Sequence, residues 1–353
     1  MSPVLLRALK LSAGALAVKA LLRQTRRMDF SNRTVIISGG SRGLGLELAR
    51  CFAEEGARLA LFARDSDELE RAGHELETRG ARLLLLPCDV RDADDVEQSV
   101  RRAVEWAGRL DVVVNNAGII QVGPFENMTR EDFENSLATH FWGPLNLLQK
   151  SIPYMTRQHS GRVINITSIG GKVAFPHLLP YCVSKFALVG LSDGIRSELA
   201  RQGIRVTTVC PGLMRTGSHI NASFKGQHEK EFALFAMVNA LPLFSVSSSR
   251  AARQIVEACR YGDPFLMITP QARVLNLLNE TFPSFMADIF KIAAALLPPP
   301  ADGRPNSKQG WESRSRLAPS WLTYISDAAV ERNNEDSKLR QNPAAAGRRG
   351  TPP

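Results

Sequence analysis

The sequence has few cysteines, and their placement gives no sign of disulfides or of a metal site. The five cysteines are spread along 353 residues, their number is odd, and no two of them form a Cys-x-x-Cys pair. A disulfide framework or a structural zinc site needs paired or closely spaced cysteines. His177 and His219 also lack metal-ligand spacing. We therefore predict no metal and a reducing compartment, and hence a cytoplasmic protein.

A hydrophobic run long enough to cross a membrane is missing near the N-terminus. Residues 1–31 are apolar and basic, but their longest uncharged run, Leu11–Val18, is too short to span a bilayer. Lys19 and Arg23 follow this run, without a convincing signal-peptide cleavage site. Two interpretations stay open for residues 1–31: a helix packed on the protein's own surface, or an anchor that makes peripheral membrane contact and leaves the cytoplasmic protein membrane-associated.

The central part of the chain lacks an excess of charge of either sign. Residues 1–33 hold seven Lys and Arg against one acidic residue, and residues 301–353 hold nine against six. The net charge of +9 therefore comes entirely from the two ends. A nucleic-acid-binding domain carries its basic residues on one face of the fold, so we predict no nucleic-acid partner.

What the middle of the chain does have is a repeating pattern. Five times, a helical and often charged segment ends at a glycine that leads into a short apolar run, and a glycine in that place ends a helix. Two further runs complete seven predicted strands, which alternate with helices. This pattern predicts an α/β fold with a seven-stranded parallel sheet between two layers of helices, whose strands all end at the ligand-binding edge. The runs lie in TVIIS, EEGARLALF, TRGARLLLL, WAGRLDVVV, HSGRVINI, RQGIRVTTV and PFLMIT.

We predict one domain over residues 32–270, followed by two extensions of different character. Residues 271–300 include the apolar helix pattern PSFMADIFKIAAALLPPP, which could cap the core, cover a substrate entrance or touch lipid. Residues 301–353 are polar and rich in Pro and Gly, which predicts a largely disordered basic tail. Within this tail, SWLTYISDAAVER is compatible with a short helix.

The first predicted strand leads directly into the glycine-rich stretch SGGSRGLGLELAR. Its glycines Gly39, Gly43 and Gly45 would make a turn that opens a helix. Glycine is needed where the backbone approaches a pyrophosphate closely, and the N-terminus of the following helix supplies N–H groups to phosphates. Because the stretch sits at a strand–turn–helix junction, it predicts a dinucleotide site.

The charges near the second strand bear on which dinucleotide binds. An acidic residue at the end of this strand would hold the ribose hydroxyls of NAD. Arg64 stands there instead, and Arg42 lies inside the glycine turn. Guanidinium groups bind a 2′-phosphate well, so the sequence favours NADP(H) over NAD(H). Asp65 keeps the NAD alternative open, since a shift of one residue would let it bind the ribose.

Six motifs occur in this order over roughly residues 32–270: the glycine turn at Ser38–Gly45, CDV with Asp89 and Val90, NNAG at Asn115–Gly118, ITS ending at Ser168, YCVSK at Tyr181–Lys185, and PGLMRT at Pro211–Thr216. With these motifs the chain resembles the short-chain dehydrogenase/reductase family. The resemblance implies a single Rossmann-type domain and a homodimer or homotetramer. It also implies the cofactor contacts, which are Ser38, Gly39, Ser41, Arg42, Gly43, Leu44, Gly45, Arg64, Asp89, Val90, Asn116, Ala117, Gly118, Tyr181, Lys185, Pro211, Gly212 and Thr216.

The same resemblance implies the catalytic roles. Tyr181 would be the general acid that protonates a carbonyl oxygen during reduction, and the base in the reverse direction. Lys185 would lower the pKa of Tyr181 and hold the nicotinamide ribose. Ser168 would hydrogen-bond the substrate oxygen and stabilise its developing charge.

His140 is a departure from the family pattern, because it stands where the family carries an asparagine that holds a proton-relay water. The register of this segment follows from Gly143, Pro153 and Met155. An imidazole can both donate and accept, so His140 could join a catalytic relay and add a titration near neutral pH. The alternative is a packing residue that hydrogen-bonds the backbone.

Residues 213–246 form a long segment rich in Phe, Met and Leu, at the place where the family varies its substrate lid. An apolar lid predicts a lipophilic small-molecule carbonyl or alcohol as the substrate, with His177, Leu178 and Leu179 lining the same pocket. The alternative is that these residues only pack or mediate oligomer contacts. An alternative to an enzyme also stays open: an NADP-binding scaffold or sensor that acts through its basic ends.

Overall fold

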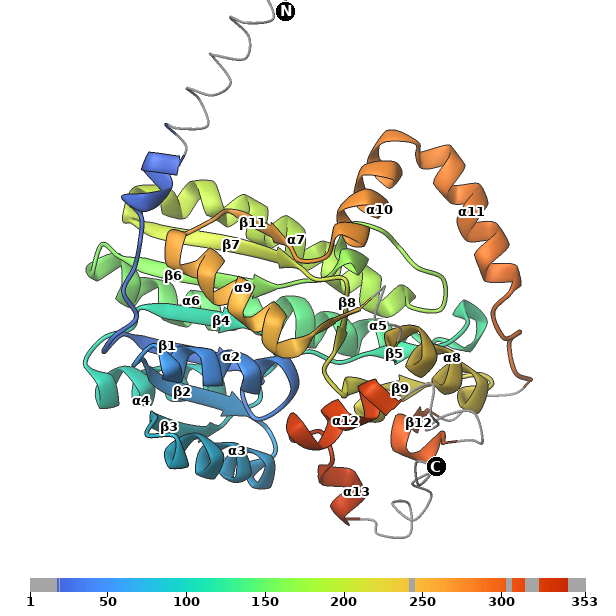
Figure 1. The fold of residues 1–353 in the computed structure, drawn as a ribbon, viewed down its shortest axis with the longest axis horizontal. Coiled ribbons are helices and arrows are strands. Elements are labelled where there is room, and N and C mark those ends of the chain that lie inside the picture. Colours follow the sequence, from blue (N-terminus) through green and yellow to red (C-terminus); the bar gives the residue numbers. More distant parts are fainter. Residues whose placement is uncertain (1–17, 19, 241–244, 303–306, 315–323, 342–353) are drawn as a thin grey trace, which may run out of the picture.

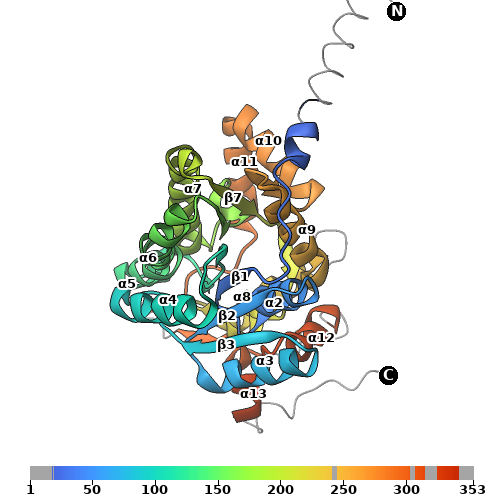
Figure 2. The same cartoon turned by 90° about the vertical axis from the view of Figure 1, so that its left-hand side faces the viewer.

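Seven parallel strands form the centre of the part of the chain that the structure describes. The structure is a computed structural model, and it describes residues 18, 20–240, 245–302, 307–314 and 324–341. The strand order is β11-β7-β6-β4-β1-β2-β3, with helices on both faces of the sheet (Figures 1 and 2). This confirms the predicted seven-stranded α/β sheet. The strands are β1 (Thr34–Ser38), β2 (Arg58–Ala63), β3 (Arg82–Pro87), β4 (Val112–Asn115), β6 (Gly161–Ile166), β7 (Ile204–Cys210) and β11 (Phe265–Met267).

The strands are apolar on both faces because each face is covered by helices. Successive residues of a strand point to opposite faces. Val35 and Ile37 accordingly belong to one core cluster, and Ile36 belongs to the other. The first cluster includes residues of α2 (Gly43–Glu54), α3 (Ser66–Thr78) and α9 (Ser248–Tyr261), and the second includes residues of α4 (Ala93–Ala107), α6 (Gly143–Arg157) and α7 (Leu179–Leu199).

Local signals set the ends of these helices. Asp92 caps α4, since its side chain accepts hydrogen bonds from the N–H groups of Asp94 and Asp95. The same helix ends at Gly108, which has a φ of 75°, in the left-handed region that glycine adopts without strain. The predicted pattern of a helix, a glycine and a strand is therefore realised at this junction.

The order of the strands reverses between β1 and β4, and this reversal marks the functional edge. The chain first builds outward from β1 to β3 and then returns to place β4 on the other side of β1. In an open parallel sheet, ligands bind beyond the carboxyl ends of the strands at such a switch point. The glycine turn follows β1 there, and the NNAG motif follows β4.

Shorter elements surround this edge. The strands β5, β9 and β12 form a small sheet, and β8 pairs with β10. A pair of helices, α10 and α11, projects from the body of the protein (Figure 1). These elements are β5 (Gln121–Val122), α5 (Arg130–Leu137), β8 (Leu213–Arg215), β9 (Ser223–Phe224), α8 (His228–Ala240), β10 (Ser245–Ser247), α10 (Pro270–Thr281), α11 (Pro283–Ala295) and β12 (Lys308–Gln309).

The described part of the C-terminal extension differs from the disorder that its composition predicts. It forms α12 (Tyr324–Arg332) and α13 (Ser337–Gln341), which lie close to α2 and α3 in Figure 2. Val330 and Leu339 are buried in a cluster with residues of α8 and β9. A few apolar side chains are therefore enough to hold this polar stretch on the core. The predicted short helix agrees with α12 over Tyr324–Arg332, while residues 315–323 lie outside the described residues.

The described end of the N-terminal segment is attached to the sheet domain. The guanidinium of Arg23 forms two hydrogen bonds of 2.9 Å with the carboxylate of Asp263, and it lies 3.8 Å from the ring centroid of Tyr261. None of the helices among the described residues is long and apolar enough to cross a membrane. Most of the predicted anchor, residues 1–17, lies outside the described residues.

Candidate active site

Three predicted catalytic side chains reach one edge of the sheet. Ser168 follows β6, while Tyr181 and Lys185 lie four residues apart on α7. Helical spacing puts the last two on one face of α7, and the Nζ atom of Lys185 is 5.7 Å from the centroid of the Tyr181 ring. The structure thus brings Ser168, Tyr181 and Lys185 together.

Gly170 shows how closely Ser168 and Tyr181 approach each other. A Cβ atom on Gly170 would lie 3.1 Å from Cε1 of Tyr181 and 3.4 Å from Oγ of Ser168. The N–H of Gly170 donates a hydrogen bond of 3.0 Å to Ser168 Oγ, which orients this hydroxyl. The turn Ile169–Gly171 therefore needs a glycine at this position to hold the serine beside the tyrosine ring.

The phenol of Tyr181 is harder to ionise than that of a free tyrosine. Desolvation raises the pKa of Tyr181 to about 12, and a hydrogen bond with Ser168 opposes this rise. The family resemblance implied a pKa lowered by Lys185. In this structure burial is the largest influence on Tyr181, and it raises the pKa. A phenol that stays neutral at physiological pH can donate a proton, which is the role needed for carbonyl reduction.

Lys185 is a buried cation. Its side chain is 4% exposed, and Nζ donates a hydrogen bond of 3.0 Å to the carbonyl oxygen of Ile166. Desolvation lowers the pKa of Lys185 to about 7. The charge of Lys185 therefore changes near neutral pH, and its charged form favours the phenolate of Tyr181.

The ring of His140 packs against that of Tyr181, and both of its ring nitrogens form hydrogen bonds. Nε2 accepts a hydrogen bond of 3.1 Å from the N–H of Ile119, so the proton of the neutral ring is on Nδ1. Nδ1 lies 2.7 Å from Oγ of Ser184, which in turn donates to the backbone carbonyl of Tyr181 at 2.8 Å. The ring also meets that of Tyr181 edge to face, with centroids 5.4 Å apart.

These surroundings favour one of the two interpretations of His140. Burial, with a smaller effect of the nearby Lys185, lowers the pKa of His140 well below its usual value. A lowered pKa disfavours the titration near neutral pH that a relay role would add. Its contacts with Ile119 and Ser184 agree with the alternative, a buried histidine that hydrogen-bonds the backbone and positions the helix carrying Tyr181.

The glycine turn is held by the NNAG motif from the neighbouring strand. The side-chain amide of Asn116 donates to the carbonyl oxygens of Ser38 and Gly39, at 3.1 and 3.0 Å. A Cβ atom on Gly39, which has a φ of 63°, would lie 2.9 Å from Cα of Ala117, and one on Gly45 would lie 1.9 Å from the carbonyl oxygen of Gly39. The turn therefore leaves no room for side chains at these glycines.

Two of the charged residues expected to select the cofactor, Arg42 and Asp65, contact other residues of the chain. Arg42 lies 3.4 Å from the carboxylate of Glu68 and 3.6 Å from that of Glu335, while Arg64 is exposed. Oδ1 of Asp65 accepts a hydrogen bond of 2.9 Å from the N–H of Glu68. Asp65 is therefore the N-cap of α3, which accounts for an acidic residue at this position without a ribose.

The remaining predicted contacts lie along the same edge. The side chain of Asp89 pairs with that of Arg91. Val90 is buried against Gly143, where a Cβ atom would lie 2.8 Å from it. Four other residues follow β4 or β7 or lie in the first turn of α2. These four are Leu44, Gly118, Pro211 and Gly212.

The apolar lid residues pack largely on one another. Phe224 and Phe232 are almost completely buried, and their rings meet edge to face with centroids 5.5 Å apart. They share a cluster with Leu178, which the sequence placed in the substrate pocket. His177 lies on the same loop and pairs with the buried Glu231, with 2.8 Å between Nδ1 and the carboxylate.

Sequence reasoning missed three residues that belong to this region. Ser184, inside the YCVSK motif, connects His140 to the backbone of Tyr181. Glu68 and Glu335 both approach Arg42. The helical spacing of Tyr181 and Ser184 offered a local signal for the first. No local signal pointed to Glu335, which lies in a stretch with the composition of a tail.

Several known proteins and one family model have sequences similar to this chain. Residues 33–225 match the family model described as short chain dehydrogenase. Oxidoreductase UcpA of Salmonella typhimurium is 38% identical over 215 residues, which cover 60% of this chain and 81% of the relative. The 3-oxoacyl-[acyl-carrier-protein] reductase FabG of Staphylococcus aureus is 34% identical over 183 residues, 52% of this chain and 74% of the relative.

A solved structure supports the same fold. A putative short-chain alcohol dehydrogenase from Sinorhizobium meliloti has a TM-score of 0.61 and 29% sequence identity. The match covers 68% of this chain and 95% of that protein. The C-terminal residues that approach Arg42 lie beyond the part of the chain that the family model matches.

Proposed function

This chain belongs to the short-chain dehydrogenase/reductase family of NAD(P)-dependent oxidoreductases acting on CH–OH groups, and on that premise we propose its finer function. The protein transfers a hydride between NADP(H) and a lipophilic carbonyl compound or secondary alcohol. The observation that carries this proposal is the arrangement of Ser168, Tyr181 and Lys185 at the carboxyl edge of the sheet.

The residues at this edge fit a dinucleotide. The glycine turn has a backbone surface without side chains at Gly39 and Gly45, where a Cβ atom would collide with neighbouring backbone. The first turn of α2 begins there and offers N–H groups to phosphates. Thr216 and the backbone after β7 would meet the nicotinamide half. The bound cofactor would supply the hydride, which no amino-acid side chain can provide.

The protein residues would orient the carbonyl group and move one proton. Ser168 Oγ would donate a hydrogen bond to the carbonyl oxygen and stabilise the charge that develops on it. The hydroxyl of Tyr181 would then transfer its proton to this oxygen. A charged Lys185 would stabilise the resulting phenolate until it is protonated again. In alcohol oxidation the same groups would act in reverse order, with Tyr181 as the base.

The preference for NADP(H) rests on the charges beside the glycine turn. Arg64 is exposed immediately after β2, and Arg42 opens α2. A guanidinium group binds a phosphate through two hydrogen bonds. Asp65, the residue that could have bound the ribose of NAD, accepts a hydrogen bond as the N-cap of α3. These three placements support a 2′-phosphate site at this end of the sheet.

The preference for a lipophilic substrate rests on the apolar loop before Tyr181. Phe175 and Leu178 on this loop are only partly buried. The ring of Phe175 meets that of Phe290 on α11 edge to face, with centroids 5.8 Å apart. The helix α11 therefore borders the substrate side and brings further apolar side chains to it. An apolar border of this kind favours substrates with a hydrophobic body.

Two kinds of association complete the proposal. A homodimer or homotetramer would cover the exposed apolar side chains of Val183 and Phe186 on α7, which are 40% and 43% exposed. A peripheral membrane contact through the N-terminus would cover Leu21 and Leu22, which are 67% and 48% exposed. The described start of the N-terminal segment and the α10–α11 pair both lie on the upper side of the molecule in Figures 1 and 2, but Figure 1 shows them toward opposite ends of its long axis.

Oxidation of NADPH and of NADH with a panel of apolar and polar ketones and aldehydes tests the proposed function. We expect turnover with NADPH and apolar ketones, and a loss of about 10²–10⁴-fold in kcat for Tyr181→Phe, the range attributed to a general acid. Tyr154→Phe, on the distant helix α6, is the matched control and should retain activity. Comparable turnover by Tyr181→Phe and the parent protein would refute the catalytic assignment.

A further inference from the structure

The C-terminal segment Arg332–Ser337 lies directly on the glycine turn. The N–H of Gly43, the first residue of α2, donates a hydrogen bond of 2.9 Å to the carbonyl oxygen of Asn333. The side-chain amide of Asn334 donates to the carbonyl oxygens of Ser41 and Glu68, both at 2.9 Å. A segment about 290 residues away in the sequence thus uses the helix N-terminus that phosphates use in dinucleotide sites.

Glu335 brings a carboxylate to the same place. Its side chain is 3% exposed and lies 3.6 Å from the guanidinium of Arg42. The side-chain amide of Asn221 donates to this carboxylate at 2.7 Å. A Cβ atom on Gly43 would lie only 2.6 Å from Oε1 of Glu335. An acid held by an arginine at a helix N-terminus has the same chemistry as a bound phosphate.

The segment also reaches the nicotinamide side of the site. The amide of Asn333 donates a hydrogen bond of 2.9 Å to the carbonyl oxygen of Thr216, one of the predicted cofactor contacts. Gly217 follows with a φ of 90°, and a Cβ atom there would lie 2.7 Å from Cα of Val330. The loop after β7 is therefore shaped to admit α12 at close range.

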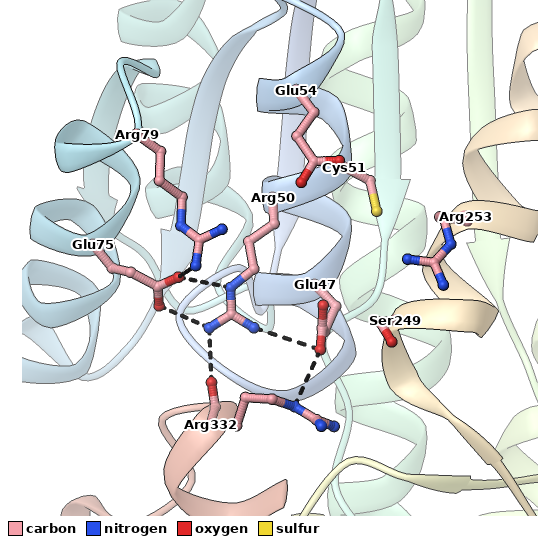
Figure 3. Close-up of a pocket in the computed structure, with 9 residues that line it drawn as sticks. All are labelled: Glu47, Arg50, Cys51, Glu54, Glu75, Arg79, Ser249, Arg253 and Arg332. Carbon is pink, nitrogen blue, oxygen red and sulfur yellow. Dashed lines mark hydrogen bonds and ion pairs between the residues drawn. The ribbon is translucent and has the colours of Figure 1, made fainter.

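Charged side chains on α2 and α3 anchor the start of the segment. The guanidinium of Arg50 binds the carboxylate of Glu75 through two hydrogen bonds, and donates a third of 2.7 Å to the carbonyl oxygen of Arg332 (Figure 3). The side chain of Arg332 lies 3.7 Å from the carboxylate of Glu47. The side chains of Arg332 and Glu75 are 52% and 31% exposed, so water and salt weaken this part of the attachment.

We propose that Asn333–Glu335 is an intramolecular occupant of the phosphate-binding end of the dinucleotide site, and that the cofactor's phosphates must displace it. This inference rests on the proposed assignment of the glycine turn to the cofactor. Only the fraction of molecules with a displaced segment binds the dinucleotide, so the apparent dissociation constant exceeds the intrinsic one by the inverse of that fraction. The C-terminus therefore sets how much cofactor the enzyme needs.

Hydrogen exchange of the full-length protein tests the displacement. Amide exchange of a peptide covering residues 324–341 is followed by mass spectrometry with and without saturating NADPH. We expect NADPH to speed exchange in this peptide, while a peptide covering α4 stays unchanged. Slower exchange on adding NADPH would overturn the proposal, because the segment would then close over the bound cofactor instead of competing with it.

Binding by charge variants separates the segment from the cofactor assignment. We expect Glu335→Gln to bind NADPH about tenfold more tightly in a fluorescence titration, since one charged contact of the closed state is lost. Glu331→Gln removes the same charge from the exposed side of α12 and should leave the affinity unchanged.

The remaining outcomes are distinguishable. Equal or weaker NADPH binding by Glu335→Gln, together with normal binding by the parent protein, would overturn the role of the segment alone. If neither protein bound NADPH or NADH, the assignment of the glycine turn would fail, and the proposal would fail with it.

Discussion

Each end of the candidate cofactor site holds a positively charged side chain, but only one of the two charges lies near carboxylates. At the catalytic end, Lys185 is buried, and its ammonium donates to a backbone carbonyl, so its pKa falls to about 7. At the phosphate end, Arg42 lies near the carboxylates of Glu68 and Glu335. One end holds a cation that is poorly compensated, and the other holds a cation that the chain itself neutralises.

This difference follows from what each end has to do. An under-compensated lysine loses or gains its charge easily and can influence a neighbouring phenol, which suits a site for proton transfer. An arginine cannot lose its proton in a protein, so it is controlled by the anion that it binds. Glu335 is such an anion supplied by the chain, and a phosphate would be its competitor.

The largest effect should come from Lys185→Met, which removes the cation of the catalytic end. We expect carbonyl reduction to fall by about 10²-fold or more, since the phenolate of Tyr181 loses its stabilising charge. The same variant should be more stable than the parent at pH 7, by on the order of 2 kcal/mol, because a desolvated ammonium is removed. Activity assays and urea unfolding measure the two effects.

The pH dependence of stability checks the sign of this effect. The folded pKa of Lys185 is lowered to about 7 from an ordinary value of 10.5. Between these values the unfolded chain binds more protons, so the free energy of unfolding of the parent should rise with pH from about 7 to 10.5. Lys185→Met should lack this rise. Parallel curves for the two proteins would contradict a desolvated lysine.

The next effect concerns the cation at the phosphate end. Arg42→Ala combined with Arg64→Ala should raise KM for NADPH by about 10²-fold or more and change KM for NADH little, since each of the two charged contacts to a phosphate is worth roughly 1.5–3 kcal/mol. Because Arg42 also lies near Glu335, Arg64→Ala alone isolates the phosphate contribution. Equal effects on both cofactors would mean that neither arginine binds a 2′-phosphate.

A smaller effect is expected at His140, which supports the catalytic end from behind. His140→Asn can still hydrogen-bond Ile119 and Ser184 and should keep kcat within about threefold. His140→Leu leaves the N–H of Ile119 without its acceptor and removes the contact with Ser184, and should lower kcat by about tenfold or more. The pH profile of kcat between pH 5 and 8 should be the same in the parent and His140→Asn. An ionisation present only in the parent would restore the relay role.

The smallest effect on the fold should follow deletion of residues 1–27. This change removes the partly exposed pair between Arg23 and Asp263, the stacking on Tyr261, and the hydrogen bond of 2.7 Å from Arg162 to the carbonyl oxygen of Arg26. The loss should cost on the order of 1 kcal/mol of stability. We expect the deletion to move protein from the membrane fraction to the supernatant without loss of NADPH affinity. If the full-length protein already stays in the supernatant at low salt, this would argue against the membrane contact.

The sequence alone was sufficient for the sheet and for the residues at its edge. Each strand is a short apolar run bounded by a glycine or a turn, and most of the motifs follow a strand, while YCVSK lies on the helix α7, so neighbours along the chain carry much of the information. Parallel strands with right-handed connections then bring their ends together. Together with the resemblance to the short-chain dehydrogenase/reductase family, this edge accounts for the prediction of Ser168, Tyr181 and Lys185 from the sequence.

Only the tertiary structure decided what surrounds these residues. The environment of His140 depends on Ile119 and Ser184, which meet it from two other elements. The apolar lid residues Phe224 and Phe232 share a buried cluster with Val330 and Leu339 from the C-terminal extension. Such contacts depend on which side chains are buried and which charges are left unbalanced after folding. The pattern of apolar residues along the chain indicates neither.

The same reason explains why composition did not indicate the contacts of residues 324–341. Its composition is polar, and such stretches remain disordered when they must bury their own apolar surface. Here the surface is supplied by the folded domain, and the donors and acceptors by Ser41, Gly43 and Thr216. A polar stretch becomes ordered when another part of the chain presents matching groups, and that match exists only in three dimensions.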